Sequence, residues 1–569
     1  MDSLMQIRVI APRLALIAWI AVSGVAAAAP GNATMTVGAE PAALPATVPA
    51  VGSVAVVIDQ GLQLERQRRW ADAVAHYEEA AREFPEDRQL AQRLDLAKLH
   101  YALERRYADG SFRESIRALS AQQSLALYGE LLRKINTHYV TTPPWRELGV
   151  RGAVAVEIAL ADVDFQATNN TQVTPEQIGQ VRQAVYQALS RRQLLAPEDL
   201  VALAGDAARA AEQYAGVPQT ATVLEFITAA AGGLDDYSGY LTADQLRDVY
   251  SQIEGNFVGL GVELKADDGA LLIVHVIPGS PAERAGIRDG DRIVAVDGRS
   301  TAELSTEQAA SRLTGAEGTY VQVTVETPGA DRRSLKVRRE HVDVPALEGV
   351  RIAKTETGVA YIKIPAFQKT TARELEAALW DLHRQGMRAL VLDLRSNPGG
   401  LLTAAVEVAD KFITNGNIVA TRGRSPQEDF DYKAHYGGTW RVPLAVLIDG
   451  DSASASEIFA GAIKDSGRGA VVGQRSYGKG SVQGIFPLGY AGAGIRLTTA
   501  LFYSPNGKKI SKAGVTPDVI VPRADPARTT VARPNLDAAA TAAMDLTDQA
   551  LQQAISAVEA RAQQRMATR

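Results

Sequence analysis

Residues 444–469 read LAVLIDGDSASASEIFAGAIKDSGRG, and this stretch decides the class of fold. It opens with apolar residues, as a strand buried on both faces of a sheet does, and passes through a short loop into a helix-like segment. Residues 359–364 and 389–394 are also strand-like, and residues 371–385 between them are helix-like. Strands that alternate with helices in this order predict an α/β core with parallel strands.

Two loops of this predicted core lie at the carboxyl ends of strands, where the sites of parallel sheets collect. In one loop three serines alternate with alanines, and the other loop runs from Arg395 to Gly400. Small residues let a hydroxyl and neighbouring backbone N–H groups approach a substrate carbonyl, as a nucleophile and its oxyanion-stabilising donors must. Taken alone, the serine–alanine turn is more typical of a flexible turn or a helix cap than of a catalytic turn.

The composition of the chain excludes several classes of protein. Its 569 residues predict about four structural units, and hydrophobic and charged fractions of 46% and 22% exclude wholesale disorder and a polytopic membrane protein. The net charge of −5 argues against a nucleic-acid-binding protein with a broad basic surface. The chain has no cysteine, which excludes thiol nucleophiles, disulfides and zinc–cysteine sites. Any covalent nucleophile must therefore use oxygen or nitrogen.

Lys479 lies between two glycines in AVVGQRSYGKGSVQGIFPL, residues 470–488. The segment from Gly473 to Lys479 matches most of a phosphate-binding loop. Gly480 stands where such a loop has a metal-binding serine or threonine, and residues 481–504 read as strands and turns instead of the phosphate-holding helix. We therefore expect no nucleotide, and the histidines show no spacing that predicts a metal or other cofactor. A lysine then remains as the base available to a serine.

Residues 256–300 alternate strand-like runs with Gly and Pro turns, and they resemble a PDZ domain that covers 256–341. The stretch GSPAERAGIRDGDRIVAVDG, residues 279–298, matches the most characteristic part of that family. Its carboxylate-binding loop is matched by Gly259, Leu260, Gly261 and Val262. Backbone N–H groups of such a loop converge on a terminal carboxylate, and the next strand edge pairs with an extended peptide. The implied ligand is a protein C-terminus.

Four motifs resemble, in order and spacing, those of the carboxyl-terminal processing or tail-specific proteases, peptidase family S41. They are LDLRSNPGG (392–400), SASASEIFAGAIKD (452–465), VVGQRSYGKGSVQ (471–483) and LTTALFYSPNGKKISKAGVTPD (497–518). GLDDYSGYLTADQL, residues 233–246, resembles the family's entry into its PDZ domain, and LYGELLRKINTHYV, residues 127–140, resembles the family more weakly. The resemblance covers about residues 234–522.

The resemblance implies a serine endopeptidase in which Ser454 is the nucleophile, Lys479 is the general base and Gln483 orients the lysine through a hydrogen bond. The implied oxyanion donors are the backbone N–H groups of Ala455 and of the Gly399–Gly400 turn, and either glycine could supply the bond. A free lysine has a pKa near 10.4, so a lysine base near neutral pH needs a pKa lowered by about three. This corresponds to a destabilisation of its charged form by about 4 kcal/mol. Burial among apolar side chains can lower the pKa of a lysine by this amount.

The implied activity is recognition of C-terminal tails of exported proteins by the PDZ domain, followed by cleavage near them for processing or degradation. The expected partners are protein substrates with apolar C-termini and a protein adaptor bound by the N-terminal helical region. The alternative is a non-catalytic scaffold of the cell envelope that bridges proteins through the PDZ domain and the helices. Intact Ser454, Lys479 and Gln483 argue against the scaffold.

The N-terminus predicts export. Arg8 and Arg13 precede an apolar run, Leu14–Ala29, whose small-residue end is typical of a signal peptide. We expect cleavage near Ala29 and a periplasmic protein. The alternative is an uncleaved inner-membrane anchor, although this run is shorter than the roughly 20 residues that span a bilayer.

The rest of the chain is predicted to be largely helical before the PDZ domain. Six residues have the spacing of one tetratricopeptide repeat, for which an ordinary helical hairpin is the alternative: Gly61, Trp70, Ala73, Tyr77, Ala80 and Pro85. Residues 542–566 could form an amphipathic helix that packs or mediates assembly, or a frayed tail.

The fold class is multidomain α+β and α/β, with a helical N-terminal region, a β-rich PDZ domain and an α/β serine-protease core. The predicted segments are a signal peptide (1–29), a linker (30–52), a repeat-like hairpin (53–110), a helical domain with an insertion (111–255), the PDZ domain (256–341), the protease core (342–525) and a C-terminal extension (526–569).

Overall fold

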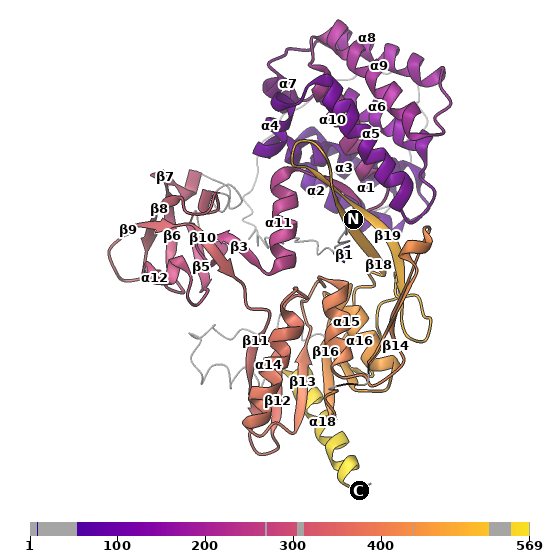
Figure 1. The fold of residues 1–569 in the computed structure, drawn as a ribbon. Helices are drawn as coiled ribbons and strands as arrows, with labels where there is room; N and C mark the ends of the chain where they lie inside the picture. The colour runs from indigo at the N-terminus through magenta and orange to yellow at the C-terminus, as the bar shows by residue number, and fades with distance from the viewer. Residues whose placement is uncertain are drawn as a thin grey trace, which may run out of the picture. The chain divides into compact units, whose positions relative to one another are not determined.

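The computed structural model describes residues 8–9, 54–267, 270–303, 312–435, 437, 439–522 and 548–567. Most of the expected signal peptide, the expected linker and the start of the C-terminal extension lie outside these residues. The described helices include none with the length and apolarity needed to cross a membrane. The described residues divide into two compact units, one made of residues 54–129 and 145–233 and the other of residues 8–9, 130–144 and those described from 234 on. Figure 1 shows the helices and strands of both.

The first unit is helical. Its helices, the fifth of which continues into the second unit, are α1 (Val54–Arg66), α2 (Trp70–Glu83), α3 (Arg88–Ala108), α4 (Gly110–Ala118), α5 (Ala121–His138), α6 (Trp145–Leu160), α7 (Val163–Asn169), α8 (Pro175–Ser190), α9 (Pro197–Ala215) and α10 (Gln219–Gly232). A Cβ atom at Gly61 would lie 2.2 Å from the buried Tyr77 ring, so the approach of α1 to α2 requires glycine. Resemblance to a tetratricopeptide repeat stays a prediction.

Two segments of the predicted helical domain, 111–255, do not belong to the helical unit. Residues 130–144 and 234–255 belong to the second unit, because they are hydrogen-bonded to its strands. The Val140 N–H donates to the Thr498 carbonyl at 2.9 Å, and β2 (Gly239–Leu241) pairs with β19 (Gly494–Tyr503). The segment that joins the helices to the PDZ domain is therefore part of the protease core.

The PDZ domain is a six-stranded sheet with a separate two-stranded pair. The sheet order is β4 (Val262–Asp267), β5 (Ala270–Val276), β6 (Arg292–Val296), β8 (Tyr320–Glu326) and β9 (Arg333–Arg338), with β7 (Arg299–Ser300) beside β6. β3 (Asn256–Gly259) pairs antiparallel with β10 (Glu340–Asp343), and α12 (Pro281–Arg284) starts directly after its capping residue, Ser280. Apolar residues such as Ile273, Ile293 and Val323 fill the core of this domain.

The central sheet of the protease core is parallel apart from one edge strand. Its order is β11 (Glu348–Lys354), β12 (Val359–Lys363), β13 (Ala389–Asp393), β16 (Leu444–Ile448), β17 (Ala470–Gly473) and β20 (Val519–Ile520), and β11 is antiparallel. Figure 1 shows β12, β13 and β16 in this core. The strand–helix alternation predicted a parallel sheet, and this is confirmed.

Alternate residues of these strands face opposite sides, as the two-residue period of a strand requires. Leu390 and Leu392 pack in one cluster with α14 (Thr371–Arg384), α15 (Leu402–Asp410) and α16 (Ala455–Asp465). Val391 packs in another cluster with Leu551 of α18 (Gln549–Ala567). The C-terminal helix therefore completes the hydrophobic core on the second face of the sheet.

The second sheet of the core is antiparallel. Its order is β1 (Arg8–Val9), β18 (Ser481–Pro487), β19, β14 (Asn417–Gly423) and β15 (Phe430–Lys433), with β2 beside β19, and α11 (Ala243–Glu254) follows β2. Because Lys479 leads into β18 and not into a helix, the segment lacks the helix N-terminus of a phosphate-binding loop. The predicted fold class of helical region, PDZ domain and α/β core is confirmed.

Candidate active site

The serine–alanine turn connects β16 to α16 and places three serines in different environments. Ser452 Oγ donates to the Leu394 carbonyl at 2.8 Å and accepts from the Asp449 N–H at 2.9 Å. Ser456 Oγ donates to the Asn397 carbonyl at 3.0 Å. Ser454 Oγ is buried and has no hydrogen-bond partner among the described residues. Of the three hydroxyls, only that of Ser454 is uncommitted and available for chemistry.

The backbone of Ser454 is strained. Its φ of 65° is unusual for a residue with a side chain, and Ser454 is the residue that caps α16, which begins at Ala455. Such strain persists where neighbouring contacts hold it, and it is common at functional sites. Here the Ser454 N–H donates to Glu457 Oε2 at 2.7 Å. The sharp turn presents the serine at the N-terminus of the helix.

Glu457 joins the serine turn to the lysine segment, and the sequence reasoning missed it. Its Oε2 accepts from the N–H groups of both Ser454, at 2.7 Å, and Lys479, at 2.8 Å. Its Oε1 accepts from Ser476 Oγ and the Gly478 N–H, both at 2.6 Å. Burial raises the pKa of Glu457, and these hydrogen bonds oppose the rise. The spacing Ser-x-x-Glu of a helix capping box was the signal that could have identified it.

Glu457→Gln is expected to impair both folding and catalysis. An amide has one acceptor oxygen, so its NH₂ group would face N–H or O–H donors that now bind a carboxylate. We expect a loss of about 1–3 kcal/mol in the free energy of unfolding, from denaturant titration, and about 100-fold in kcat because the two segments shift. The control is Glu559→Gln on α18, which weakens an ion pair with Lys354 outside the two segments that Glu457 joins. Unchanged stability and kcat in Glu457→Gln would contradict this role.

The Lys479 side chain is buried, with only 4% of the residue exposed. Its Nζ lies 4.7 Å from the centroid of the Tyr237 ring. The segment before it is held by the chain near Lys512, whose N–H donates to the Gly478 carbonyl at 2.7 Å. Burial disfavours the charged form, as a lysine base requires, whereas an aromatic face this close favours it. Tyr237 belongs to the quoted 233–246 motif, but nothing in its spacing pointed to the lysine.

Gln483 lies on β18, fully buried, four positions beyond Lys479. Its Nε2 donates to Ser481 Oγ at 2.9 Å and to Thr498 Oγ1 at 3.4 Å. Its Oε1 is buried and accepts no hydrogen bond from the described residues, so the expected bond from Lys479 is not formed. The structure thus places an unused amide oxygen on the strand that the lysine segment leads into.

The glycine turn packs directly against the nucleophile turn. A Cβ atom at Gly399 would lie 2.8 Å from Ser454 Cβ and 3.0 Å from the Ala455 nitrogen, so only glycine fits. The Gly399 N–H donates to Asn397 Oδ1 at 2.8 Å. The Gly399 N–H therefore already has a side-chain acceptor, and the role of either glycine as an oxyanion donor stays a prediction. Gly400 forms a parallel bridge with Phe367, whose hydrogen bonds run from the Phe367 N–H to the Gly399 carbonyl and from the Leu401 N–H to the Phe367 carbonyl. The Gly400 N–H takes no part in these two bonds.

Comparison with known proteins follows the same segments. The family model "Peptidase family S41" matches residues 358–521, and "PDZ domain" matches residues 272–327. The carboxy-terminal-processing protease of Bartonella bacilliformis is 37% identical over 320 residues, which are 55% of this chain and 73% of that protein. The carboxyl-terminal-processing protease of a Picosynechococcus species is 36% identical over 325 residues, 56% of this chain and 78% of that protein. The chain belongs to the carboxy-terminal-processing proteases of peptidase family S41.

This S41 protease is a serine-type peptidase, so the enzymatic prediction is supported over the non-catalytic scaffold. Among solved structures, the photosystem II D1 C-terminal processing protease is 27% identical, with a TM-score of 0.37, and the match covers 70% of this chain and 93% of that chain.

In the PDZ domain of the protease, the predicted carboxylate-binding residues connect β3 to β4. Gly259 ends β3, and Val262 begins β4, which is the edge strand of its sheet. Gly261 has a φ of 81°, and a Cβ there would lie 2.3 Å from Ser280 Cβ. The Leu260 carbonyl accepts from the Ala282 N–H at 2.9 Å, which fixes the loop against α12. A glycine loop beside an edge strand is the arrangement that peptide addition to a sheet uses.

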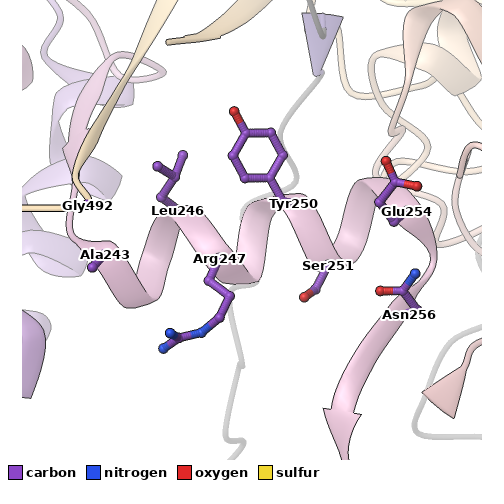
Figure 2. Close-up of a pocket in the computed structure, with 8 residues that line it drawn as sticks. All are labelled: Ala243, Leu246, Arg247, Tyr250, Ser251, Glu254, Asn256 and Gly492. Carbon is purple, nitrogen blue, oxygen red and sulfur yellow. The ribbon is translucent and has the colours of Figure 1, made fainter. Parts of the chain in front are cut away.

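A cavity of about 380 Å³ opens elsewhere in the protease, along α11 (Figure 2). Figure 2 shows its lining residues, which are Ala243, Leu246, Arg247, Tyr250, Ser251, Glu254, Asn256 and Gly492. None of them is a predicted catalytic residue. Hydrogen-bond chemistry, and not cavity size, therefore locates the candidate active site.

Proposed function

We propose that this S41 protease is a serine endopeptidase that uses a Ser454–Lys479 dyad, binds C-terminal tails of exported proteins through its PDZ domain, and cleaves near them. The observation that carries the proposal is the state of the three serine hydroxyls, of which Ser454 Oγ alone has no partner among the described residues. The shared hydrogen bonds of Glu457 to the N–H groups of Ser454 and Lys479 support the pairing.

In the proposed reaction, Ser454 Oγ attacks the substrate carbonyl while neutral Lys479 takes the hydroxyl proton. The N–H groups of Ala455 and Gly400 donate to the oxyanion, and each such donor contributes about 3–4 kcal/mol to the transition state. Lys479 then gives its proton to the leaving amine and activates the water that hydrolyses the acyl-enzyme. Hydrolysis of casein by the purified protein, compared with the Ser454→Ala and Lys479→Arg variants, tests the dyad.

Recognition of substrate tails is proposed to depend on the terminal carboxylate. We expect amidation of the C-terminus to lower kcat/KM by about 10–100-fold, because charge-assisted hydrogen bonds from the loop at Gly259–Val262 are lost. The measurement compares two peptides that are identical except for this group. Acetylation of the N-terminus, which leaves the carboxylate in place, is the control and should have no effect. Equal rates for free and amidated peptides would contradict tail recognition.

Export to the periplasm is proposed from the Leu14–Ala29 run and its small-residue end. The intact mass of the protein isolated from its own cells is expected to correspond to a chain that starts close to residue 30. A chain that still starts at Met1 would contradict cleavage.

The helical N-terminal region is proposed to bind a protein adaptor, which co-purification with and without residues 53–110 tests. Apolar side chains at the substrate C-terminus are proposed from the peptide-binding mode of the PDZ loop.

A further inference from the structure

Thr498 lies directly opposite Gln483 in the antiparallel pair of β18 and β19. Both residues are buried, and Gln483 Nε2 donates to Thr498 Oγ1 at 3.4 Å. The other partner of this amide is Ser481 Oγ, at 2.9 Å. A serine hydroxyl can either donate or accept, so Ser481 alone does not decide which end of the Gln483 amide faces it.

The Thr498 hydroxyl, in contrast, has a fixed polarity. It donates its proton to Asp235 Oδ1 at 3.2 Å. The same oxygen accepts from the N–H groups of Tyr237 and Ser238, both at 2.8 Å, so it is an acceptor and carries no proton. Because a hydroxyl has one proton, Thr498 Oγ1 presents only lone pairs to Gln483. Only the NH₂ end of the amide can face lone pairs without repulsion.

The backbone of Thr498 is held equally firmly. Its N–H donates to Ser238 Oγ at 3.1 Å, and its carbonyl accepts from the Val140 N–H at 2.9 Å. The turn that carries Asp235 and Ser238 also carries Tyr237, whose ring lies 4.7 Å from Lys479 Nζ. One short segment therefore contacts the lysine directly and the glutamine through Thr498.

We infer that Thr498, with its proton committed to Asp235, sets the amide orientation of Gln483 so that the oxygen and not the NH₂ group is left for Lys479. The unpartnered Gln483 Oε1 is the atom that this orientation leaves over. A lysine Nζ is a hydrogen-bond donor in both its charged and neutral forms, so an oxygen can hold it, whereas a flipped NH₂ group would occupy the lone pair that acts as the base. Thr498 is thus a positioning residue. The inference rests on the proposed role of Gln483 in orienting Lys479.

Thr498→Val tests the inference, since valine replaces the hydroxyl by a methyl group of similar shape. We expect kcat on a peptide substrate to fall by about tenfold or more, with KM changed less than about twofold, because only the base is affected. Thr498→Ser keeps the hydroxyl and is expected to retain kcat within about threefold. The matched control is Thr499→Val, which removes the buried hydroxyl of the next residue, a group with no hydrogen-bond partner in the described part of the chain. It should leave kcat unchanged.

A double-mutant cycle separates positioning from general damage to the fold. In a Gln483→Met background the amide is absent, so Thr498→Val should lower kcat no further; independent losses that multiply would overturn the inference. Unchanged kcat in Thr498→Val alone would overturn it as well. If Gln483→Met itself keeps full kcat, the proposed role of Gln483 fails. If Gln483→Met is slow and Thr498→Val is not, only the inference about Thr498 fails.

Discussion

Ser454→Ala is expected to lower kcat/KM by about 10⁴-fold or more, because neither neighbouring serine of the turn can take over the attack. The hydroxyls of Ser452 and Ser456 are bound to the carbonyls of Leu394 and Asn397, so neither is free to act as a nucleophile. The measurement is hydrolysis of casein and of a defined peptide by equal amounts of folded protein. Near-full activity in Ser454→Ala would remove this serine from the mechanism.

The same substitution is expected to leave the fold intact or slightly more stable. Ser454 Oγ is buried without a hydrogen-bond partner among the described residues, and a buried polar group in that state destabilises the native protein. Thermal unfolding of Ser454→Ala should therefore occur at or above the wild-type temperature. Ser452→Ala is the contrasting variant, because it removes the bonds to the Leu394 carbonyl and the Asp449 N–H. It should lose stability while keeping the nucleophile.

Lys479→Arg is expected to lower kcat by about 10²–10⁴-fold although it keeps a positive charge. A guanidinium stays protonated throughout the pH range in which proteins are folded, so it cannot take the Ser454 proton. It is also larger and planar, and it would have to fit beside the Tyr237 ring in a buried site. The experiment measures kcat across pH 6–10 for the wild type and Lys479→Arg.

Lys479→Met is the companion variant, because methionine keeps an unbranched apolar chain without a charge. Both substitutions should be inactive, and Lys479→Met should unfold at the higher temperature of the two, since it buries no charge. If Lys479→Arg kept near-full turnover, the lysine could not be the base. If Lys479→Met kept it, no group at this position would take part in proton transfer.

Local sequence patterns predicted much of the core correctly. The apolar run Leu444–Ile448, the small residues after it and the strands beyond Lys479 are features of neighbouring residues, and the structure has β16, the serine turn and β18 at these places. Strand patterns after Lys479 were enough to argue against a phosphate-binding loop, because a helix and a strand have different periods. Family motifs then pointed to Ser454, Lys479 and Gln483.

Long-range contacts could not be predicted in the same way. The Glu457 carboxylate was overlooked because three of its four partners, Ser476, Gly478 and Lys479, lie in another segment of the chain. Gly399 and Gly400 look equivalent in sequence, and only the Asn397 side chain, folded back onto the Gly399 N–H, distinguishes them. Residues 130–144 belong to the other unit through bonds such as Val140 to Thr498, which no local pattern indicates.

The sequence by itself determined the parallel core, the PDZ domain, the protease family and the residue types at the candidate site, because each follows from short-range patterns. Tertiary structure alone decided which serine hydroxyl is uncommitted, which glycine N–H is available and how the Gln483 amide is turned. These depend on hydrogen bonds between strands and loops that are distant along the chain. A donor or acceptor is defined by its partner, and folding chooses that partner.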